Sequence, residues 1–175
     1  TLKQVLGFRE ELAKMEQLDF DPIRMEKVYN QERSEWQSLF SKEDKGMEED
    51  KPCWIAPDLA EGQWWDMCLP DYWEKNGLKN FDGVVWFRRS FEIPAEWIGK
   101  PLKLNLGMID DEDITYFNGV EIARGAGYMT PRTYTIPAKL VKAGKAVLAV
   151  RVSDFGGEGG IHGKAEDLYV EADGK

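Results

Sequence analysis

The sequence predicts a mainly β protein, an antiparallel β-sandwich preceded by an N-terminal helical segment. Up to about residue 40, apolar residues recur at steps of three and four, whereas from Pro52 onward they alternate with a period of two. These are the periods of helices and of strands, respectively. After Pro52 the alternating segments are short, turn residues separate them, and no helix is long enough for a βαβ crossover. The strands are therefore expected to pair antiparallel.

Two helices are expected before residue 40. The apolar face of the first is formed by Leu2, Val5, Phe8, Leu12 and Met15. In the second, Asp21 is placed to cap free amide groups and Pro22 suits the first helical position. Its apolar contacts are expected from Ile23, Val28, Trp36, Leu39 and Phe40.

Residues 41–51, SKEDKGMEEDK, hold eight charged residues among eleven, so they are expected to form a solvated connector. The predicted organisation is a helical segment and charged linker over 1–51, belonging to a flanking domain, and a sandwich over 52–175. The opening residues TLKQVLGF contain neither an initiator methionine nor a signal peptide, and we expect the chain to be cut from a longer protein.

The best-defined strand covers Val84 to Ile93, with Trp86 and Arg88 on its polar face and Arg89 on its apolar face. The hairpin 114–123 turns at Asn118-Gly119, the pair that a two-residue type I′ turn prefers. Further strands are expected at 63–69, 102–107, 132–136, 145–153 and 167–171.

Charge and apolar content exclude several partners. Lys and Arg number 23 against 32 Asp and Glu, a net charge of −9, so nucleic acid and anionic membrane surfaces are repelled. No run of 18 apolar residues exists, which argues against a membrane span. A neutral or polyol ligand is easier to reconcile. Cys53 and Cys68 are interpreted as buried small side chains, with a disulfide as the alternative.

The stretch SDFGGEGGIHG, residues 153–163, contains five glycines and the single histidine of the chain, His162. It matches neither a Walker loop nor a dinucleotide fingerprint. No serine lies in a G-x-S-x-G elbow, so we assign no catalytic residue. Two interpretations stay open: a loop in which Asp154 and His162 contact a sugar or another domain, and a structural loop in which Asp154 caps its own backbone.

Three other features concern ligands. The run Asp110 to Asp113 could hold calcium, but it matches no EF-hand spacing, and a solvated turn is the simpler interpretation; we therefore assign no metal and no cofactor. Trp86 is the tryptophan best placed to stack on a sugar. Arg89, on an apolar face, is expected to form a structural ion pair, with Asp82, Asp111 and Asp154 as the partners to test.

Four segments resemble a known family: LPDYWEKNGLKNFDGVVWFRRSFEIPAEW, LKLNLGMIDDEDITYFNGVEIA, YMTPRTYTIPAKLVKAGKAVLAVRVSDFGGEGGIHG and EDLYVEA. From about Trp64 to Ala172 they are similar to the galactose-binding-like jelly-roll domain of bacterial sialate O-acetylesterases (9-O-acetylesterases). More loosely, they resemble the sugar-binding domain of glycoside hydrolase family 2. In that second family, the positions matching Asn80 to Asp82 and Asp154 reach the neighbouring active site.

The esterase resemblance implies a parent enzyme, a carboxylic ester hydrolase, whose Gly-Asp-Ser and Asp-x-x-His motifs lie in a flanking SGNH-type catalytic domain. It also implies an extracytoplasmic location. The chain contains neither motif.

The resulting hypothesis is a non-catalytic, carbohydrate-binding-like accessory domain. Its candidate sugar-contacting or domain-interface residues are Asp82, Trp86, Arg88, Asp154 and His162. The alternatives are a family 2 sugar-binding domain, a free-standing carbohydrate-binding module, and a structural interaction domain that binds no sugar.

Overall fold

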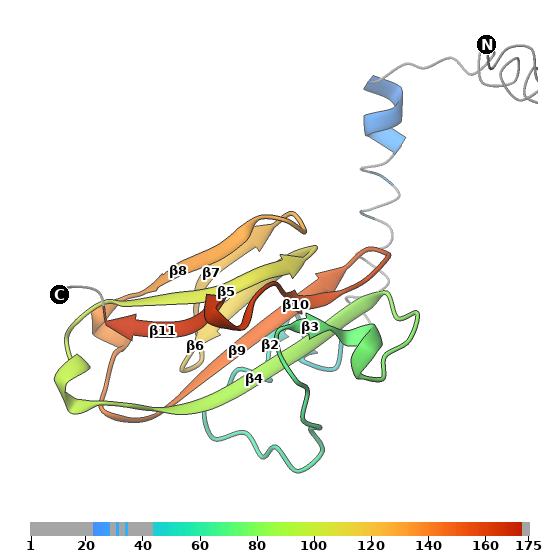
Figure 1. Ribbon diagram of the computed structural model, residues 1–175. Coiled ribbons are helices and arrows are strands. Elements are labelled where there is room, and N and C mark those ends of the chain that lie inside the picture. Colours follow the sequence, from blue (N-terminus) through green and yellow to red (C-terminus); the bar gives the residue numbers. More distant parts are fainter. Residues whose placement is uncertain (1–22, 29–30, 32–33, 35–43, 173–175) are drawn as a thin grey trace, which may run out of the picture. The chain divides into compact units, whose positions relative to one another are not determined.

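A computed structural model describes residues 23–28, 31, 34 and 44–172 (Figure 1). The chain divides into two compact units, Thr1–Leu39 and Phe40–Lys175. In the first unit, residues 23–28, 31 and 34 are helical, within the second predicted helix, and its apolar Ile23, Met25 and Val28 are exposed. The first predicted helix and the Asp21 cap lie outside the described residues. Within the described ranges, no helix is long and apolar enough to cross a membrane.

The second unit is an antiparallel β-sandwich, which confirms the predicted fold class (Figure 1). One sheet has the strand order β4-β9-β6-β7. Its strands are β4 (Gly83–Ile93), β9 (Gly144–Asp154), β6 (Glu112–Phe117) and β7 (Val120–Ala126). β4 lies at an edge of this sheet, and its whole length pairs with β9.

The other sheet is built around β5 (Leu102–Asp110). β11 and β10 pair with successive parts of β5, β8 pairs with its other edge, and β3 extends the sheet beyond β10. These strands are β11 (Leu168–Ala172), β10 (Gly160–His162), β8 (Pro131–Ile136) and β3 (Asp71–Tyr72). The short 3-10 helices are η2 (Trp73–Asn76), η3 (Ala95–Trp97), η4 (Ala138–Leu140) and η5 (Ala165–Asp167).

The main core lies between the two sheets. Alternate residues of β5 and β9 point into it because successive strand side chains face opposite sides. Leu102 and Leu104 of β5 are buried there, as are Val150 and Val152 of β9. The period of two that predicted these strands therefore marks the face that each strand buries.

A second apolar cluster covers the outer face of the four-stranded sheet. Trp86 and Tyr116 form its buried centre, and Trp54 and Trp64 pack against them. Asp44, itself 8% exposed, accepts hydrogen bonds from Trp86 Nε1 at 2.8 Å and from Arg151 Nε at 2.7 Å. The segment that begins at Asp44 thus covers a face that alternation alone assigns to solvent.

The described residues begin to pack on the sandwich at Asp44, before the boundary that the sequence predicts near Lys51. The described residues from Asp44 onward belong to the sandwich unit, and the division falls between Leu39 and Phe40. The paired strands β1 (Met47–Glu48) and β2 (Lys51–Pro52) lie inside the segment predicted to be a solvated connector. The charge of Asp44 is tolerated there because Arg151 pairs with it.

Two further predictions are corrected. Residues 63–69, expected to form a strand, are not in a strand; Trp64 packs on the outer cluster while Trp65 is exposed. Both cysteines were expected to be buried small side chains, but Cys68 is exposed and Cys53 is only partly buried. Both thiols are free. Burial raises the pKa of the Cys53 thiol.

Of the two arginines of β4, Arg88 has a buried side chain and forms an ion pair, whereas Arg89 is exposed. The side chain of Arg88 is only 2% exposed; it pairs with Glu61 and donates to the carbonyls of Trp54 and Ala56. Arg89 is exposed and forms no ion pair with any described residue. Asp82, Asp111 and Asp154, the partners expected for Arg89, form no ion pair with it. Because β4 is an edge strand, the long side chain of Arg89 can reach water.

Candidate functional site

Several candidate residues meet at one end of the sandwich, where loops join the two sheets. Gly83 at the start of β4 pairs with Asp154 at the end of β9, which brings Asp82 close to Asp154. After the glycine loop, Gly160 of β10 pairs with Asp110 of β5. The loop before β4 and the loop after β9 are thus neighbours, as the family resemblance implies.

Asp154 is the most deeply buried of these residues, with 0% of its surface exposed. Its Oδ1 accepts a hydrogen bond from the Gly156 N–H at 3.0 Å, so the predicted capping of its own backbone is present. Its Oδ2 is buried and has no hydrogen-bond partner. Burial raises the pKa of Asp154 to about 6; the Gly156 N–H works against this rise, and the charges of Asp111 and Asp82 add to it.

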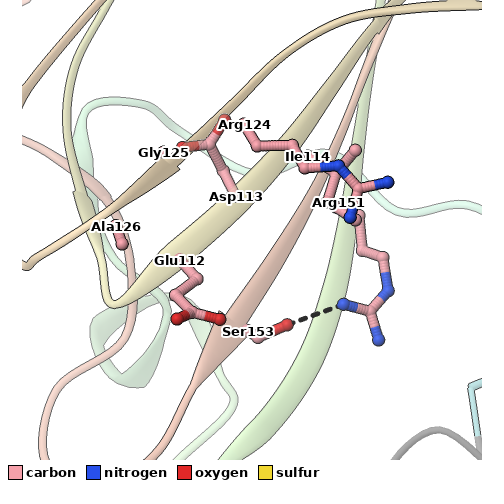
Figure 2. Close-up of a pocket in the computed structure, with 8 residues that line it drawn as sticks. All are labelled: Glu112, Asp113, Ile114, Arg124, Gly125, Ala126, Arg151 and Ser153. Atoms are coloured by element: carbon pink, nitrogen blue, oxygen red, sulfur yellow. Dashed lines mark hydrogen bonds between the residues drawn. The ribbon is translucent and has the colours of Figure 1, made fainter.

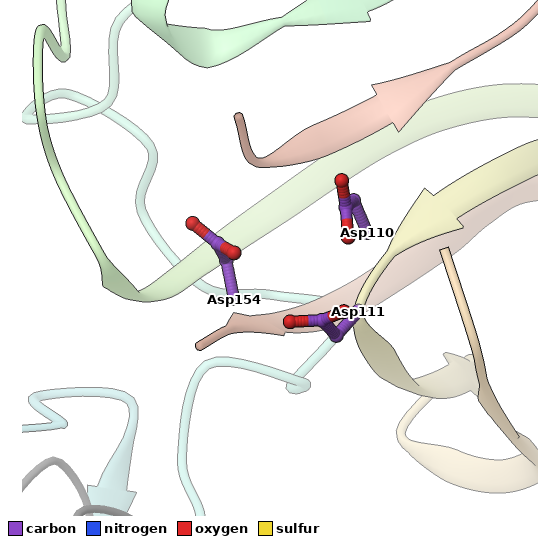
Figure 3. A group of neighbouring side chains, drawn as sticks. All are labelled: Asp110, Asp111 and Asp154. Atoms are coloured by element: carbon purple, nitrogen blue, oxygen red, sulfur yellow. The ribbon is translucent and has the colours of Figure 1, made fainter. Parts of the chain in front are cut away.

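Asp110 and Asp111 lie beside Asp154 (Figure 3). One carboxylate oxygen from each of the three residues lies within 4.8 Å of the other two. Asp111 Oδ2 accepts a hydrogen bond from the Phe155 N–H at 3.0 Å. Burial, followed by the hydrogen bond and charge of Asp111, raises the pKa of Asp110 to about 7. This end of the sandwich therefore concentrates negative charge in a partly buried site.

His162 lies on β10 and is 8% exposed. Its Nε2 lies 2.9 Å from the Tyr128 carbonyl oxygen, and its ring stacks on Tyr72 with the centroids 4.8 Å apart. A carbonyl oxygen only accepts, so Nε2 carries the hydrogen and donates it. Ser153 Oγ bonds instead to Arg151, at 2.8 Å. The histidine and the serine that lie near each other in sequence thus have separate partners.

The glycine loop packs against η2. The Gly159 carbonyl accepts from the Trp73 N–H at 2.9 Å, and the Gly159 N–H donates to Glu74. A Cβ atom at Gly159 would lie 2.1 Å from the Trp73 ring, so a side chain has no room there. The tip of the loop, Gly156 to Glu158, is exposed. The loop combines both interpretations left open by the sequence: a packed structural base and an accessible tip.

A buried ion pair that sequence reasoning missed joins the two sheets behind this end. Arg132 of β8 donates from Nε to Asp113 Oδ1 at 2.7 Å, and the two side chains are 1% and 0% exposed. Thr115 and Tyr134 also donate to Asp113. Asp113 therefore has a structural role, separate from the acidic residues that precede it in the chain.

A shallow hollow of about 350 Å³ lies over the four-stranded sheet (Figure 2). Its cations are already paired, Arg124 with Glu121 and Arg151 with Asp44. None of the five candidate site residues lines it. Its lining residues are Glu112, Asp113, Ile114, Arg124, Gly125, Ala126, Arg151 and Ser153.

Two candidates are removed from the site by their packing. Trp86 is 6% exposed, and it contacts Trp54 and Tyr116, so no face of its ring is free for a sugar. The side chain of Arg88 is only 2% exposed, and its guanidinium donates to Glu61 and to two carbonyls, so it is buried by the protein itself. At the loop end of the sandwich Asp82 is exposed, whereas Asp154 and His162 are themselves buried.

No protein-family model matches the chain, and no curated protein sequence matches it. Among solved structures, the chain is similar to Bacteroides uniformis β-glucuronidase 2, covalently bound to cyclophellitol-6-carboxylate aziridine, at 24% identity and a TM-score of 0.54, covering 61% of this chain and 14% of that one. A glycosyl hydrolase family 2 member from Bacteroides cellulosilyticus has 23% identity and a TM-score of 0.54, covering 61% and 17%. A β-glucuronidase from an uncultured Clostridium sp. has 26% identity and a TM-score of 0.49, covering 55% and 18%.

The chain spans less than a fifth of the length of each of these proteins, between 14% and 18%. At 23–24% identity the two Bacteroides structures show a shared fold. The β-sandwich of this chain is thus a fold that also occurs as one part of larger glycosyl hydrolases.

Proposed function

We propose that this chain is a non-catalytic, carbohydrate-binding-like accessory domain of a larger carbohydrate-active hydrolase. The observation that carries the proposal is the approach of Asp82 to Asp154, where β4 begins and β9 ends, beside the exposed tip of the glycine loop. These positions include those that, by the family resemblance, reach a neighbouring active site. Among the described residues, His162 and Ser153 form separate hydrogen bonds, to the Tyr128 carbonyl and to Arg151.

Two parent enzymes fit this proposal equally well. One is a sialate O-acetylesterase, in which an SGNH-type catalytic domain flanks the sandwich and carries out carboxylic ester hydrolysis. The other is a family 2 glycoside hydrolase, in which the sandwich contributes Asp82 and Asp154 to the rim of the active site. In either enzyme the loop end faces the catalytic domain, and the exposed Asp82 carboxylate and the tip of the glycine loop are the groups placed to contact sugar hydroxyls.

The coding sequence on both sides of this segment tests the proposal most directly. We expect one continuous reading frame that also encodes a catalytic domain. Gly-Asp-Ser upstream identifies the esterase, and a TIM-barrel domain downstream identifies the glycosidase. A reading frame that encodes this chain alone contradicts the proposal and favours the free-standing module.

Enzyme assays on the purified chain provide the second test. We expect no turnover of 9-O-acetylated sialic acid, of 4-nitrophenyl acetate or of 4-nitrophenyl β-glucuronide. Activity that disappears in Ser153→Ala would show that the chain holds its own catalytic centre. The matched control is Ser90→Ala, which makes the same side-chain change elsewhere in the four-stranded sheet.

Sugar binding separates the accessory domain from an independent module. Calorimetric titration with galactose, sialic acid and glucuronic acid should give no saturable heat if the loop end needs the catalytic domain to complete its site. A dissociation constant of about 1 mM or tighter, about −4 kcal/mol or more favourable, supports the free-standing module instead. In that case Asp82→Asn should weaken binding and the exposed Asp66→Asn should not.

A further inference from the structure

The carboxylates of Asp110, Asp111 and Asp154 converge without a basic partner (Figure 3). Asp110 ends β5 in one sheet, Asp154 ends β9 in the other, and Asp111 lies between β5 and β6. In the part of the chain that the structure describes, no lysine, arginine or histidine forms an ion pair with any of the three. Their charges are therefore uncompensated by the protein.

A second observation points to a ligand at this place. Asp154 is fully buried, and its Oδ2 has no hydrogen-bond donor. An ionised oxygen that has lost its water and gained no partner is costly to bury. This carboxylate has one oxygen within 4.8 Å of an oxygen of Asp110 and of Asp111, so a positive charge placed among the three would compensate its buried charge.

Two basic residues described at this end of the sandwich, Arg132 and His162, have other partners. The guanidinium of Arg132 contacts the same chain segment, yet its Nε bonds to Asp113 and its Nη2 donates to the carbonyls of Ile109 and Asp111. Nε2 of His162 is bonded to a carbonyl. The charges of Glu74 and Asp82 add to the negative potential around Asp154.

We propose that Asp110, Asp111 and Asp154 bind a hard divalent cation, and that Ca²⁺ is the ion they match best. Carboxylates alone line the site, and hard cations prefer oxygen ligands, whereas zinc favours nitrogen and sulfur. The cation bridges the ends of the two sheets beside the glycine loop. The site goes beyond the proposed function and does not depend on it.

The type of ligand and the irregular setting favour Ca²⁺ over Mg²⁺. One oxygen from each of the three carboxylates lies within 4.8 Å of the other two, at the ends of two different sheets. Ca²⁺ tolerates flexible arrangements of oxygen ligands at about 2.3–2.6 Å, whereas Mg²⁺ demands near-ideal octahedral geometry at about 2.0–2.1 Å. The remaining positions around Ca²⁺ are filled by second carboxylate oxygens and water, as Ca²⁺ accepts six to eight oxygens.

The test is calorimetric titration of the full chain, freed of metal with EDTA and then dialysed, against CaCl₂ and MgCl₂. We expect one Ca²⁺ per chain with a dissociation constant below about 1 mM, and weaker binding of Mg²⁺. Ca²⁺ at 100 times the dissociation constant should raise the ratio of folded to unfolded protein about 100-fold and the melting temperature with it. Asp154→Asn and Asp111→Asn should each weaken Ca²⁺ binding at least tenfold.

Asp66→Asn is the matched control, since it removes the same charge from an exposed position and should leave Ca²⁺ binding unchanged. In EDTA, Asp154→Asn should melt at a higher temperature than the wild type because it removes a buried charge without a partner. Circular dichroism confirms that each variant is folded. No heat at about 10 mM Ca²⁺, equal affinity in Asp154→Asn and wild type, or tighter binding of Mg²⁺ than of Ca²⁺ overturns the proposal.

Discussion

Replacing Arg132 by methionine tests how much of the sandwich depends on its buried ion pair. Methionine keeps most of the length and apolar volume of the side chain but provides no hydrogen-bond donor. The change therefore leaves the charge of Asp113 without its cation. It also removes the donors for four carbonyl oxygens, those of Ile109, Asp111, Gly127 and Thr130.

The expected cost follows from burial. Both side chains of the pair are at most 1% exposed, and removing one partner of such a pair destabilises a protein by about 3–5 kcal/mol. The hydroxyl groups of Thr115 and Tyr134 still donate to Asp113, which argues for the lower half of that range. For a chain of this size each kcal/mol lowers the melting temperature by about 2–4 °C, so the variant should melt roughly 10 °C lower.

Arg124→Met is the matched control. Arg124 pairs with Glu121 on the surface, where the two side chains are 64% and 41% exposed, and such pairs contribute about 0–1 kcal/mol. Urea unfolding followed by circular dichroism measures both variants. The double variant Arg132→Met with Asp113→Asn should lose less stability than the sum of the single changes, because no lone charge stays buried. A loss for Arg132→Met that equals the loss for Arg124→Met would refute this reasoning.

Three other changes test the packing by thermal denaturation. Gly159→Ala should lower the melting temperature because its Cβ would lie 2.1 Å from the Trp73 ring, whereas Gly62→Ala, with no atom within 4 Å, should not; equal effects contradict the crowding. Asp44→Ala should cost about 1–3 kcal/mol, since a buried indole N–H and a guanidinium lose their acceptor; no loss would mean that the covering segment is dispensable. Leu104→Ala, at a position 1% exposed, should cost about 2–5 kcal/mol, and a smaller loss would show that the core refills the space.

Alternation in the sequence predicted most of the strands because it records which face of a strand is buried. β5 illustrates this, since Leu102 and Leu104 enter the core and Lys103 between them does not. The same signal misled at residues 63–69, where Trp64 is partly buried against the outer cluster without any strand pairing. It also missed β10, whose Gly160 contributes no side chain to a pattern. Burial and backbone pairing are separate properties, and alternation reports only the first.

The sequence could not show what covers a polar face. Alternation placed Trp86 and Arg88 on the outer side of β4, which is correct. Their hydrogen-bond partners Asp44 and Glu61, however, come from 42 and 27 positions earlier in the chain. Arg88 is consequently buried and paired, and Arg89 reaches solvent from the edge of the sheet. The resemblance to known families did predict that Asp82 and Asp154 lie at the same place, because a known fold shows which segments distant in sequence are neighbours in space.

The acidic run 110–113 shows how one charged segment is accommodated in two different ways. Asp113 belongs to β6, where Arg132 from the facing sheet neutralises it. The same guanidinium donates to the Asp111 carbonyl at 2.9 Å, so it holds the backbone of the run while its charge is committed to Asp113. Asp110 and Asp111 are then left with Asp154 as their neighbour. Because Arg132 neutralises Asp113 at one end of the run, charge balance at the other end requires protons or a bound cation. The two alternatives differ in their response to Ca²⁺.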